Sequence, residues 1–399
     1  MAVPNATNNN EHSSIRVGIL GCASIARKVA RAILHSESQC TLTAVASRSR
    51  DKAAILAEDH IVQASDNSIS MSDLTLFGGE NTYQELIDSN DIVDALYIPL
   101  PTALHKQWVL PTLQAGKHVL LEKPVALSVQ EWEEFVKAAK ENNCYIQDGT
   151  MFVHHPRTAL IREMVSNSDE LGLFQRLESG FTFYAPEEVF QDNIRSQASL
   201  DALGCVGDLA WYQIRAALLW AGSFGSSASE TSEGEDSSKN NIVSVQVIDW
   251  KVNSQGVPID VTYILKFQNH GTAMFHCGFG AHFRQYMKII RTKKGVFLED
   301  FVLPKDDPVH YRLESMSLTD YDLLAQHDCQ AVACPNEPVQ EVLLWKHFAQ
   351  SARVVESFGW QSKEAGKARQ LLVMTTNNQT ILDAIMKSIQ SGGSKIVTI

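Results

Sequence analysis

Two short segments of the chain carry side chains that could perform acid/base chemistry together. The segment "HVLLEKPVAL" places Glu122 and Lys123 directly after an apolar run and before a proline, and "LGCVGDLAWYQIR" carries Asp208 and Tyr212. In a helix, a separation of four residues brings two side chains onto one face. A lysine near a tyrosine stabilises the phenolate and lowers its pKa, so Lys123 and Tyr212 could act as an acid/base pair. Such a pair suits transfer of a proton to or from a hydroxyl group.

The segments around Lys123 alternate between apolar runs and amphipathic stretches. The runs "IRVGILG", "CTLTAVASR", "DIVDALYIPLP" and "KHVLLEKP" are typical of buried strands, and the stretches between them are typical of helices. We therefore predict an α/β domain over residues 15–148 with a doubly wound parallel sheet of the Rossmann type.

The carboxyl ends of the strands line the ligand crevice in such a sheet, so Glu122 and Lys123 should face cofactor and substrate. Ser128 and Glu131 form a capping-box pattern at the next helix.

A different pattern follows over residues 149–399. Longer extended runs, such as "LFQRLESGFTFYA" and "PIDVTYILKFQ", have little helix between them and predict an α+β domain with an open, mainly antiparallel sheet. Two amphipathic helices are expected near the end, in "PVQEVLLWKHFAQSARVVESF" and "QLLVMTTNNQTILDAIMKSIQSGG". Residues 222–241 are rich in Ser, Gly and acidic residues and cannot bury a core, so we expect a disordered insertion. We interpret residues 1–14 as a disordered tail.

The turn after the first strand is a candidate cofactor site. "VGILGCASIA" lies where the strand passes into a helix, and a dinucleotide pyrophosphate can rest on a helix N-terminus at that place. The usual Gly-x-Gly-x-x-Gly pattern is reduced here to Gly21, with Ala23 and Ala26 at the other two places. Ser24 and Ile25 complete the turn. Alone, this turn indicates a cofactor no more strongly than it indicates close packing.

The end of the second strand indicates which dinucleotide would bind. NAD sites usually place an Asp or Glu there to bind the ribose 2′-hydroxyl. This chain has Ser47 and Arg48, followed by Arg50 and Lys52. A hydroxyl and a guanidinium can hold a 2′-phosphate through charge-assisted hydrogen bonds, so we predict NADP, with NAD as a weaker possibility. The alternative is that these are solvated charges at the start of a helix.

One segment resembles a known family closely. "LYIPLPTALHKQWVLPTLQAGKHVLLEKPVAL" is similar to the signature block of the glucose-fructose oxidoreductase, inositol dehydrogenase and rhizopine-catabolism (Gfo/Idh/MocA) oxidoreductases. The resemblance spans nearly the whole chain from Ile15. It implies a Rossmann domain, a C-terminal α+β domain, a homodimer formed through the open sheet, and hydride transfer to or from a nicotinamide cofactor. Lys123 would be the family lysine near the nicotinamide.

The resemblance extends to further site residues. Asp208 followed by Tyr212 is similar to a family motif, and a tyrosine at the second place resembles the branch that contains dimeric dihydrodiol dehydrogenase and NADP-dependent D-xylose dehydrogenase. Without the resemblance, a polar rim and a half-buried aromatic on a packing helix would be the better interpretation of both residues. His155 lies at the entrance to the second domain and could contact substrate. With the resemblance, the candidate cofactor contacts are Gly21, Ala23, Ser24, Ile25, Ser47, Arg48, Pro99, Leu100, His105, Glu122 and Lys123, and the candidate substrate contacts are Lys123, His155, Asp208 and Tyr212.

Several functions stay open at this point. The substrate could be an aldose such as D-xylose or D-glucose, or a trans-1,2-dihydrodiol. A non-catalytic NADP-binding regulator is a rival of another class, although the joint presence of Lys123, Asp208 and Tyr212 disfavours it. A structural or interaction protein would leave the basic residues at the second strand without a purpose. No Asp, Glu or Cys is spaced to complete a metal site with His154 and His155, so we expect no metal.

Composition limits the partners and the compartment. A formal net charge of −12 argues against nucleic acid or an anionic membrane as partner. No apolar run reaches the ~18 residues that a membrane-spanning helix needs, and the first residues lack the features of a secretion signal, so we expect a cytoplasmic protein. The run "TAMFHCGFGAHF" is apolar and aromatic, which predicts a homodimer through the second sheet. No paired spacing suits zinc or a redox motif, so we expect buried thiols at Cys22, Cys40, Cys144, Cys205, Cys277, Cys329 and Cys334.

Overall fold

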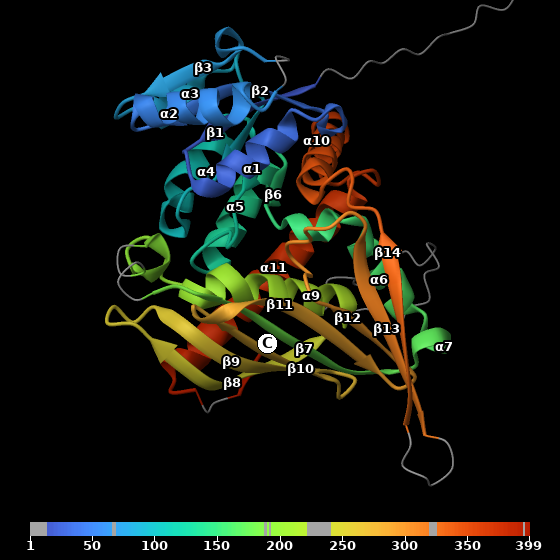
Figure 1. The fold of residues 1–399 in the computed structure, drawn as a ribbon. Helices are drawn as coiled ribbons and strands as arrows, with labels where there is room; N and C mark the ends of the chain where they lie inside the picture. The colour runs from blue at the N-terminus through green and yellow to red at the C-terminus, as the bar shows by residue number, and fades with distance from the viewer. Residues whose placement is uncertain are drawn as a thin grey trace, which may run out of the picture.

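The computed structural model describes residues 14–65, 69–186, 190, 193–221, 241–318, 325–393 and 396–399. The expected tail and the expected insertion, apart from Ser14 and Asn241, lie outside the described residues. Figure 1 shows two layers, a smaller sheet with its helices above and a larger sheet below.

Six parallel strands form the first sheet in the order β3-β2-β1-β4-β5-β6. All side chains of β4 and β5 are buried, as expected for parallel strands covered on both faces. The predicted doubly wound parallel sheet is confirmed. Its strands are β1 (Ile15–Leu20), β2 (Cys40–Ser47), β3 (Thr75–Gly78), β4 (Ala95–Ile98), β5 (His118–Leu121) and β6 (Ile146–Asp148), and its helices are α1 (Ser24–Ile33), α2 (Arg50–Ala57), α3 (Thr82–Asp88), α4 (His105–Gln114) and α5 (Val129–Glu141).

The capping pattern predicted for α5 is present in a modified form. Ser128 Oγ accepts a hydrogen bond from the backbone N–H of Glu131. The Glu131 carboxylate accepts in return from the N–H of Leu127, one residue earlier than in the usual capping box. This cap fixes where the segment after Lys123 turns into the helix.

Nine strands form the second sheet in the order β14-β13-β12-β11-β7-β10-β9-β8-β15. Neighbouring strands are antiparallel except β7 and β10, which run parallel, so the expected open, mainly antiparallel sheet is confirmed. The strands are β7 (Phe174–Tyr184), β8 (Ile242–Val252), β9 (Pro258–Phe267), β10 (Thr272–Gly278), β11 (Gly280–Arg291), β12 (Lys294–Leu298), β13 (Val309–Leu318), β14 (Ala325–Cys334) and β15 (Val397–Thr398).

Two helices cover one face of this sheet, α9 (Trp211–Trp220) and α11 (Gly366–Gln390), and both lie between the layers in Figure 1. Along β9 the side chains alternate, with Val261, Tyr263 and Leu265 buried and Lys266 exposed. Among the described residues, further α-helices are α6 (Pro156–Ser166), α7 (Ser168–Leu171) and α10 (Gln340–Phe358).

Helices α10 and α11 also pack on the first layer. Trp345 Nε1 of α10 donates to the carbonyl oxygen of Val29 at 2.9 Å, and Trp132 Nε1 donates to Thr376 Oγ1 of α11 at 2.9 Å. The end of the chain therefore holds the two layers together. The predicted domain boundary after residue 148 stays a prediction.

The run "TAMFHCGFGAHF" is more buried than expected. Phe275 and Phe279 lie in the core of the chain itself, whereas Met274 and Phe283 are 42% and 48% exposed. Alternation along β10 places every second residue toward the helices, which the sequence argument overlooked. The homodimer stays a prediction.

Candidate active site

Lys123 joins the two layers of the molecule. It follows β5, and its Nζ lies 2.6 Å from Asp208 Oδ1 and 2.9 Å from the Asp208 carbonyl oxygen. Both side chains are 11% exposed. The predicted neighbourhood of Lys123 and Asp208 is thus present as a largely buried, hydrogen-bonded ion pair.

Asp208 and Tyr212 lie in continuous helix, with a π-helical turn over Val206–Ala210 that passes directly into α9. Such turns are rare and occur often at functional sites. Lys123 Nζ lies 4.9 Å from the centroid of the Tyr212 ring. Lys123, Asp208 and Tyr212, here called the catalytic cluster, are therefore together at the carboxyl end of β5.

Arg195 is a member of this site that the sequence analysis missed. Its Nε donates to Asp208 Oδ2 at 2.7 Å, so the Asp208 carboxylate receives one cation on each oxygen. Arg195 lies in the turn Ile194–Ser196, and no periodicity or motif in the sequence links that turn to Asp208.

The two cations decide the protonation of the Asp208 carboxylate. Burial alone would raise its pKa, but Lys123 and Arg195 outweigh burial and lower the pKa of Asp208 to about 2. The pKa of Lys123 is raised because Asp208 and Tyr212 outweigh its burial. At neutral pH the pair is a carboxylate and an ammonium.

The expectation that Lys123 lowers the pKa of Tyr212 is wrong in its net direction. Burial outweighs the lysine and raises the pKa of Tyr212 to about 12. The ring is 5% exposed and lies near Phe152 and Phe181, with centroids 6.2 and 5.8 Å away. An apolar pocket of this kind destabilises a phenolate, and sequence spacing could not show it.

Glu122 directly follows β5 and precedes Lys123. Its Oε1 accepts from the Tyr97 hydroxyl at 2.5 Å, and its Oε2 accepts from the backbone N–H of Lys123 at 3.3 Å. Burial raises the pKa of Glu122. The carboxyl group therefore positions Lys123, and its role as a cofactor contact stays a prediction.

Asp201 is a second acidic group that the sequence analysis missed. It is 8% exposed, and its Oδ1 has no hydrogen-bond partner among the described residues. Burial, followed by the nearby Asp208 carboxylate, raises the pKa of Asp201 to about 7. The site thus holds a buried carboxyl group that titrates near neutral pH.

The turn after β1 fits a dinucleotide. Gly21 has φ +115°, and a Cβ added there would lie 2.7 Å from Leu100 Cδ2, so a larger residue would clash with the loop after β4. Ala23 is the N-cap of α1 and makes no side-chain cap, and Ser24 is exposed. The first N–H groups of α1 are not capped by a side chain, as a pyrophosphate site requires.

The tip of β2 fits a 2′-phosphate. Ser47 is 6% exposed and its Oγ accepts from the N–H of Ser49 at 3.3 Å. Arg48 is exposed and lies beside the Tyr83 hydroxyl. Neither position carries a carboxylate that would repel a phosphate.

The two predicted histidines are held by structural hydrogen bonds. His105 is fully buried, with its ring nitrogens 3.0 and 2.9 Å from the carbonyl oxygens of Val125 and Leu100. It ties the loops after β4 and β5 together. His155 accepts from the N–H of Arg157 at the start of α6 and lies 3.0 Å from Asn336 Oδ1. Ligand contacts by either ring stay predictions.

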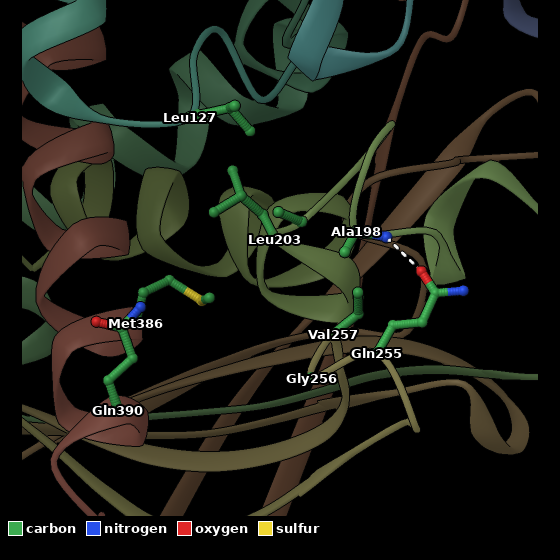
Figure 2. A pocket seen from close by; sticks show the side chains of 9 residues that line it. Leu127, Ala198, Leu203, Gln255, Gly256, Val257, Met386 and Gln390 are labelled. Atoms are coloured by element: carbon green, nitrogen blue, oxygen red, sulfur yellow. Dashed lines mark hydrogen bonds between the residues drawn. The ribbon is translucent and has the colours of Figure 1, made fainter.

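A cavity of about 300 Å³ has none of the residues of the catalytic cluster in its lining (Figure 2). It is lined by Leu127 from the first layer, by Leu203, by the turn before β9, and by Met386 on α11, and it has no charged lining residue. The charged cluster, and not this uncharged cavity, is therefore our candidate active site. Within the described ranges, no three His, Cys, Asp or Glu side chains are grouped to hold a metal ion.

Two further features bear on the earlier expectations. The seven cysteines are unpaired, and five are buried, whereas Cys22 is partly exposed and Cys329 is exposed, so buried thiols were predicted correctly only in part. No helix in the described part of the chain is long and apolar enough to cross a membrane.

Parts of this chain are similar in sequence to a protein family and to named enzymes. Residues 15–150 match an oxidoreductase family with an NAD-binding Rossmann fold. The chain is 35% identical over 210 residues to dTDP-3,4-didehydro-2,6-dideoxy-alpha-D-glucose 3-reductase of Actinomadura kijaniata, covering 52% of this chain and 56% of that protein. It is 29% identical over 276 residues to D-xylose 1-dehydrogenase (NADP(+)) 2 of Haloferax volcanii, covering 69% and 73%. The chain thus spans little more than half the length of the first of these relatives, 56%.

Solved structures share the whole fold. The 3-ketoreductase KijD10 from Actinomadura kijaniata, solved with NADP and TDP-benzene, has a TM-score of 0.72 at 22% identity over 94% of this chain and 97% of that one. Aldose-aldose oxidoreductase from Caulobacter crescentus, complexed with glycerol, has a TM-score of 0.73 at 16% identity over 97% and 100%. At these identities the likeness establishes the fold alone. Residues 15–150 match the Gfo/Idh/MocA oxidoreductase family, and the solved structures show that the chain as a whole shares their fold.

Proposed function

We propose that this chain is an NADP-dependent oxidoreductase that transfers a hydride between a carbon atom of a sugar and the nicotinamide. The single observation that carries the proposal is the catalytic cluster, in which Lys123 Nζ lies 2.6 Å from Asp208 Oδ1 and 4.9 Å from the Tyr212 ring. It lies at the carboxyl end of a parallel sheet, the edge at which such sheets bind ligands.

The cofactor would be held by the turn after β1 and by the tip of β2. The backbone N–H groups at the start of α1 would bind the pyrophosphate, and Ser47 with Arg48 would bind the 2′-phosphate. When bound, the nicotinamide accepts or supplies the hydride. Two similar proteins support NADP over NAD as the cofactor. The Haloferax volcanii relative is named an NADP(+) dehydrogenase, and KijD10 was solved with NADP.

Lys123 and Tyr212 would move the hydroxyl proton. In the oxidising direction one of them takes the proton as the hydride leaves the carbon, and in the reducing direction it returns the proton to the carbonyl oxygen. A tyrosine whose pKa is about 12 is protonated at neutral pH, which favours Tyr212 as a proton donor to a forming alkoxide. The buried ion pair would keep the Lys123 ammonium beside that oxygen, where it stabilises negative charge.

A sugar substrate is the best-supported class. The relatives named above act, by their names, on D-xylose, on a dTDP-linked deoxysugar and on aldoses. The Lys123–Asp208 pair lies beside the Tyr212 ring, and several polar residues at one site suit a substrate with several hydroxyl groups. We propose D-xylose or D-glucose as first aldoses to test and trans-1,2-dihydrodiols as the alternative.

The test is reduction of NADP by the purified protein against pentoses, hexoses, polyols and dihydrodiols, with NADPH oxidation by keto sugars as the reverse assay. Turnover of at least one sugar is expected, at a rate well above that of the dihydrodiols. Tight NADP binding without turnover of any compound would instead identify a cofactor-binding regulator.

A further inference from the structure

Arg195 has a geometry that its contact with Asp208 explains only in part. Its Nε donates to Asp208 Oδ2 at 2.7 Å, and the side chain is 40% exposed. Within the described ranges, neither terminal nitrogen of the guanidinium has a hydrogen-bond partner. The four N–H donors of the two terminal nitrogens therefore stay available beside the catalytic cluster.

The turn that carries Arg195 is anchored on both sides. Asn193 Oδ1 accepts from the backbone N–H of Arg195 at 3.1 Å. Ser196 donates from its hydroxyl to the carbonyl of Phe190, and its own carbonyl accepts from Asn253 Nδ2 at 2.7 Å. A side chain on such a fixed turn can position a ligand group with little loss of freedom.

The charged groups around Arg195 include two cations, Arg195 itself and Lys123. Lys123 and Arg195 share the one carboxylate of Asp208. The other carboxyl groups nearby are those of Glu122, which is bonded to the Tyr97 hydroxyl, and Asp201, which is buried. Two cations at one site in a chain of net charge −12 favour the binding of an anion there. A guanidinium fork matches the two oxygens of a carboxylate or a phosphate.

We propose that Arg195 is a positioning residue that binds an anionic oxygen group of the substrate, so that sugars carrying a carboxylate or a phosphate are preferred over neutral aldoses. This inference rests on the proposed function and narrows its substrate class. A planar carboxylate and a tetrahedral phosphate both offer anionic oxygens to the Arg195 guanidinium. The hydroxyl group that reacts would lie at Lys123 and Tyr212.

The kinetic test compares D-glucuronate, D-glucose 6-phosphate and D-glucose as substrates with NADP. At least one anionic sugar should have a kcat/KM roughly 10-fold or more above that of glucose. Arg195→Gln should remove this advantage by lowering the anionic kcat/KM roughly 10- to 100-fold more than the glucose value, mainly through KM. Arg195→Lys should recover part of it. Which of the two anionic sugars benefits distinguishes a carboxylate from a phosphate.

Arg16→Gln is the matched control. Arg16 is also 40% exposed, and its guanidinium lies 2.6 Å from the Asp94 carboxylate. It lies at the start of β1, whereas the candidate site lies where the strands of this sheet end. Arg16→Gln should leave the selectivity between the three sugars unchanged. A preference for glucose in the wild type, or an equal loss for all three sugars in Arg195→Gln, would overturn the inference and leave the proposed function intact.

A binding measurement separates this inference from the proposed function. D-gluconate carries the carboxylate but has no aldehyde carbon to oxidise, and its binding in the presence of NADP can be followed by calorimetry. Arg195→Gln should raise the Kd of gluconate roughly 10-fold or more. If no sugar is turned over, the proposed function fails. Absent or unchanged gluconate binding overturns the role of Arg195 on its own.

Discussion

Asp208 Oδ1 lies 2.6 Å from Lys123 Nζ, although the two residues are 85 positions apart in the chain. One belongs to the edge of the Rossmann sheet and the other to the helix that covers the second sheet. Both side chains are 11% exposed. The ion pair therefore depends on how the two layers are placed. Removal of Asp208 would leave the largely buried Lys123 ammonium without its counterion, whereas removal of Lys123 would leave Asp208 paired with Arg195.

Asp208→Asn should lower stability and activity together. The variant keeps a hydrogen-bond acceptor but leaves the Lys123 ammonium without its carboxylate, so we expect a loss of roughly 1–3 kcal/mol in the free energy of unfolding. Denaturant unfolding at neutral pH measures it. Asp94→Asn, whose carboxylate pairs with Arg16 at a site 38% exposed, is the control and should cost less than ~1 kcal/mol. Equal losses in both variants would contradict the account of the buried pair.

Arg48→Ala should weaken NADP far more than NAD. Loss of a charge-assisted contact to the 2′-phosphate should cost roughly 1.5–3 kcal/mol in NADP binding, whereas NAD lacks that phosphate. Fluorescence titration with both cofactors measures the difference. The exposed Arg162 on α6 offers a control substitution to Ala that should change neither affinity. An equal loss for both cofactors in Arg48→Ala would refute the assignment.

Much of the fold and half of the site could be predicted from sequence. Continuous apolar strands between amphipathic helices define a parallel sheet, and "LEKP" at a strand end places Lys123 in the ligand crevice. The four-residue spacing placed Asp208 and Tyr212 on one helix face, and the family resemblance was needed to place both near Lys123. These features depend on residues close together in the chain, so they can be recognised in a single sequence.

The missing parts depend on long-range packing. Arg195 and Asp201 reach Asp208 through a turn whose position is set by hydrogen bonds to distant residues such as Asn253. The raised pKa of Tyr212 comes from burial near Phe152 and Phe181, residues far from it in sequence. The spacing of residues along the chain does not reveal contacts between such distant residues.

The stability of the chain should fall with rising pH through Asp201. Its pKa is about 7 in the fold, because burial and then Asp208 raise it, against ~3.9 in an unfolded chain. The folded state therefore binds more protons between these values, and its stabilisation is present below ~3.9 and lost as the pH rises through about 7. Asp201→Asn cannot ionise, so it should be more stable than the wild type at pH ~8 by roughly 1–3 kcal/mol.

Thermal unfolding of both proteins from pH ~4 to ~8 measures this difference. The gap between variant and wild type should grow with pH, and because other titrating groups are common to both, the gap isolates Asp201. The exposed Asp306 provides a control substitution to Asn that should give no such trend. A gap that is constant across the range would show that Asp201 does not titrate there.

We expect a homodimer through the open face of the second sheet. Met274 and Phe283 are 42% and 48% exposed on that sheet, and apolar groups of this size favour a partner surface. Light scattering at micromolar concentration should give twice the chain mass of 44.2 kDa. Met274→Asp should shift the mass toward one chain, and a wild type that is already monomeric would contradict the prediction.

The central claim is that Lys123 and Tyr212 act as one acid/base unit, and steady-state kinetics of Lys123→Met test it most directly. Methionine keeps most of the side-chain volume and removes the charge, so NADP binding should persist while kcat falls ~10²-fold or more on the best substrate. Tyr212→Phe should give a similar loss, and the double variant should lose much less than the product of the two. A Lys123→Met protein that binds NADP and keeps the wild-type kcat would contradict the account.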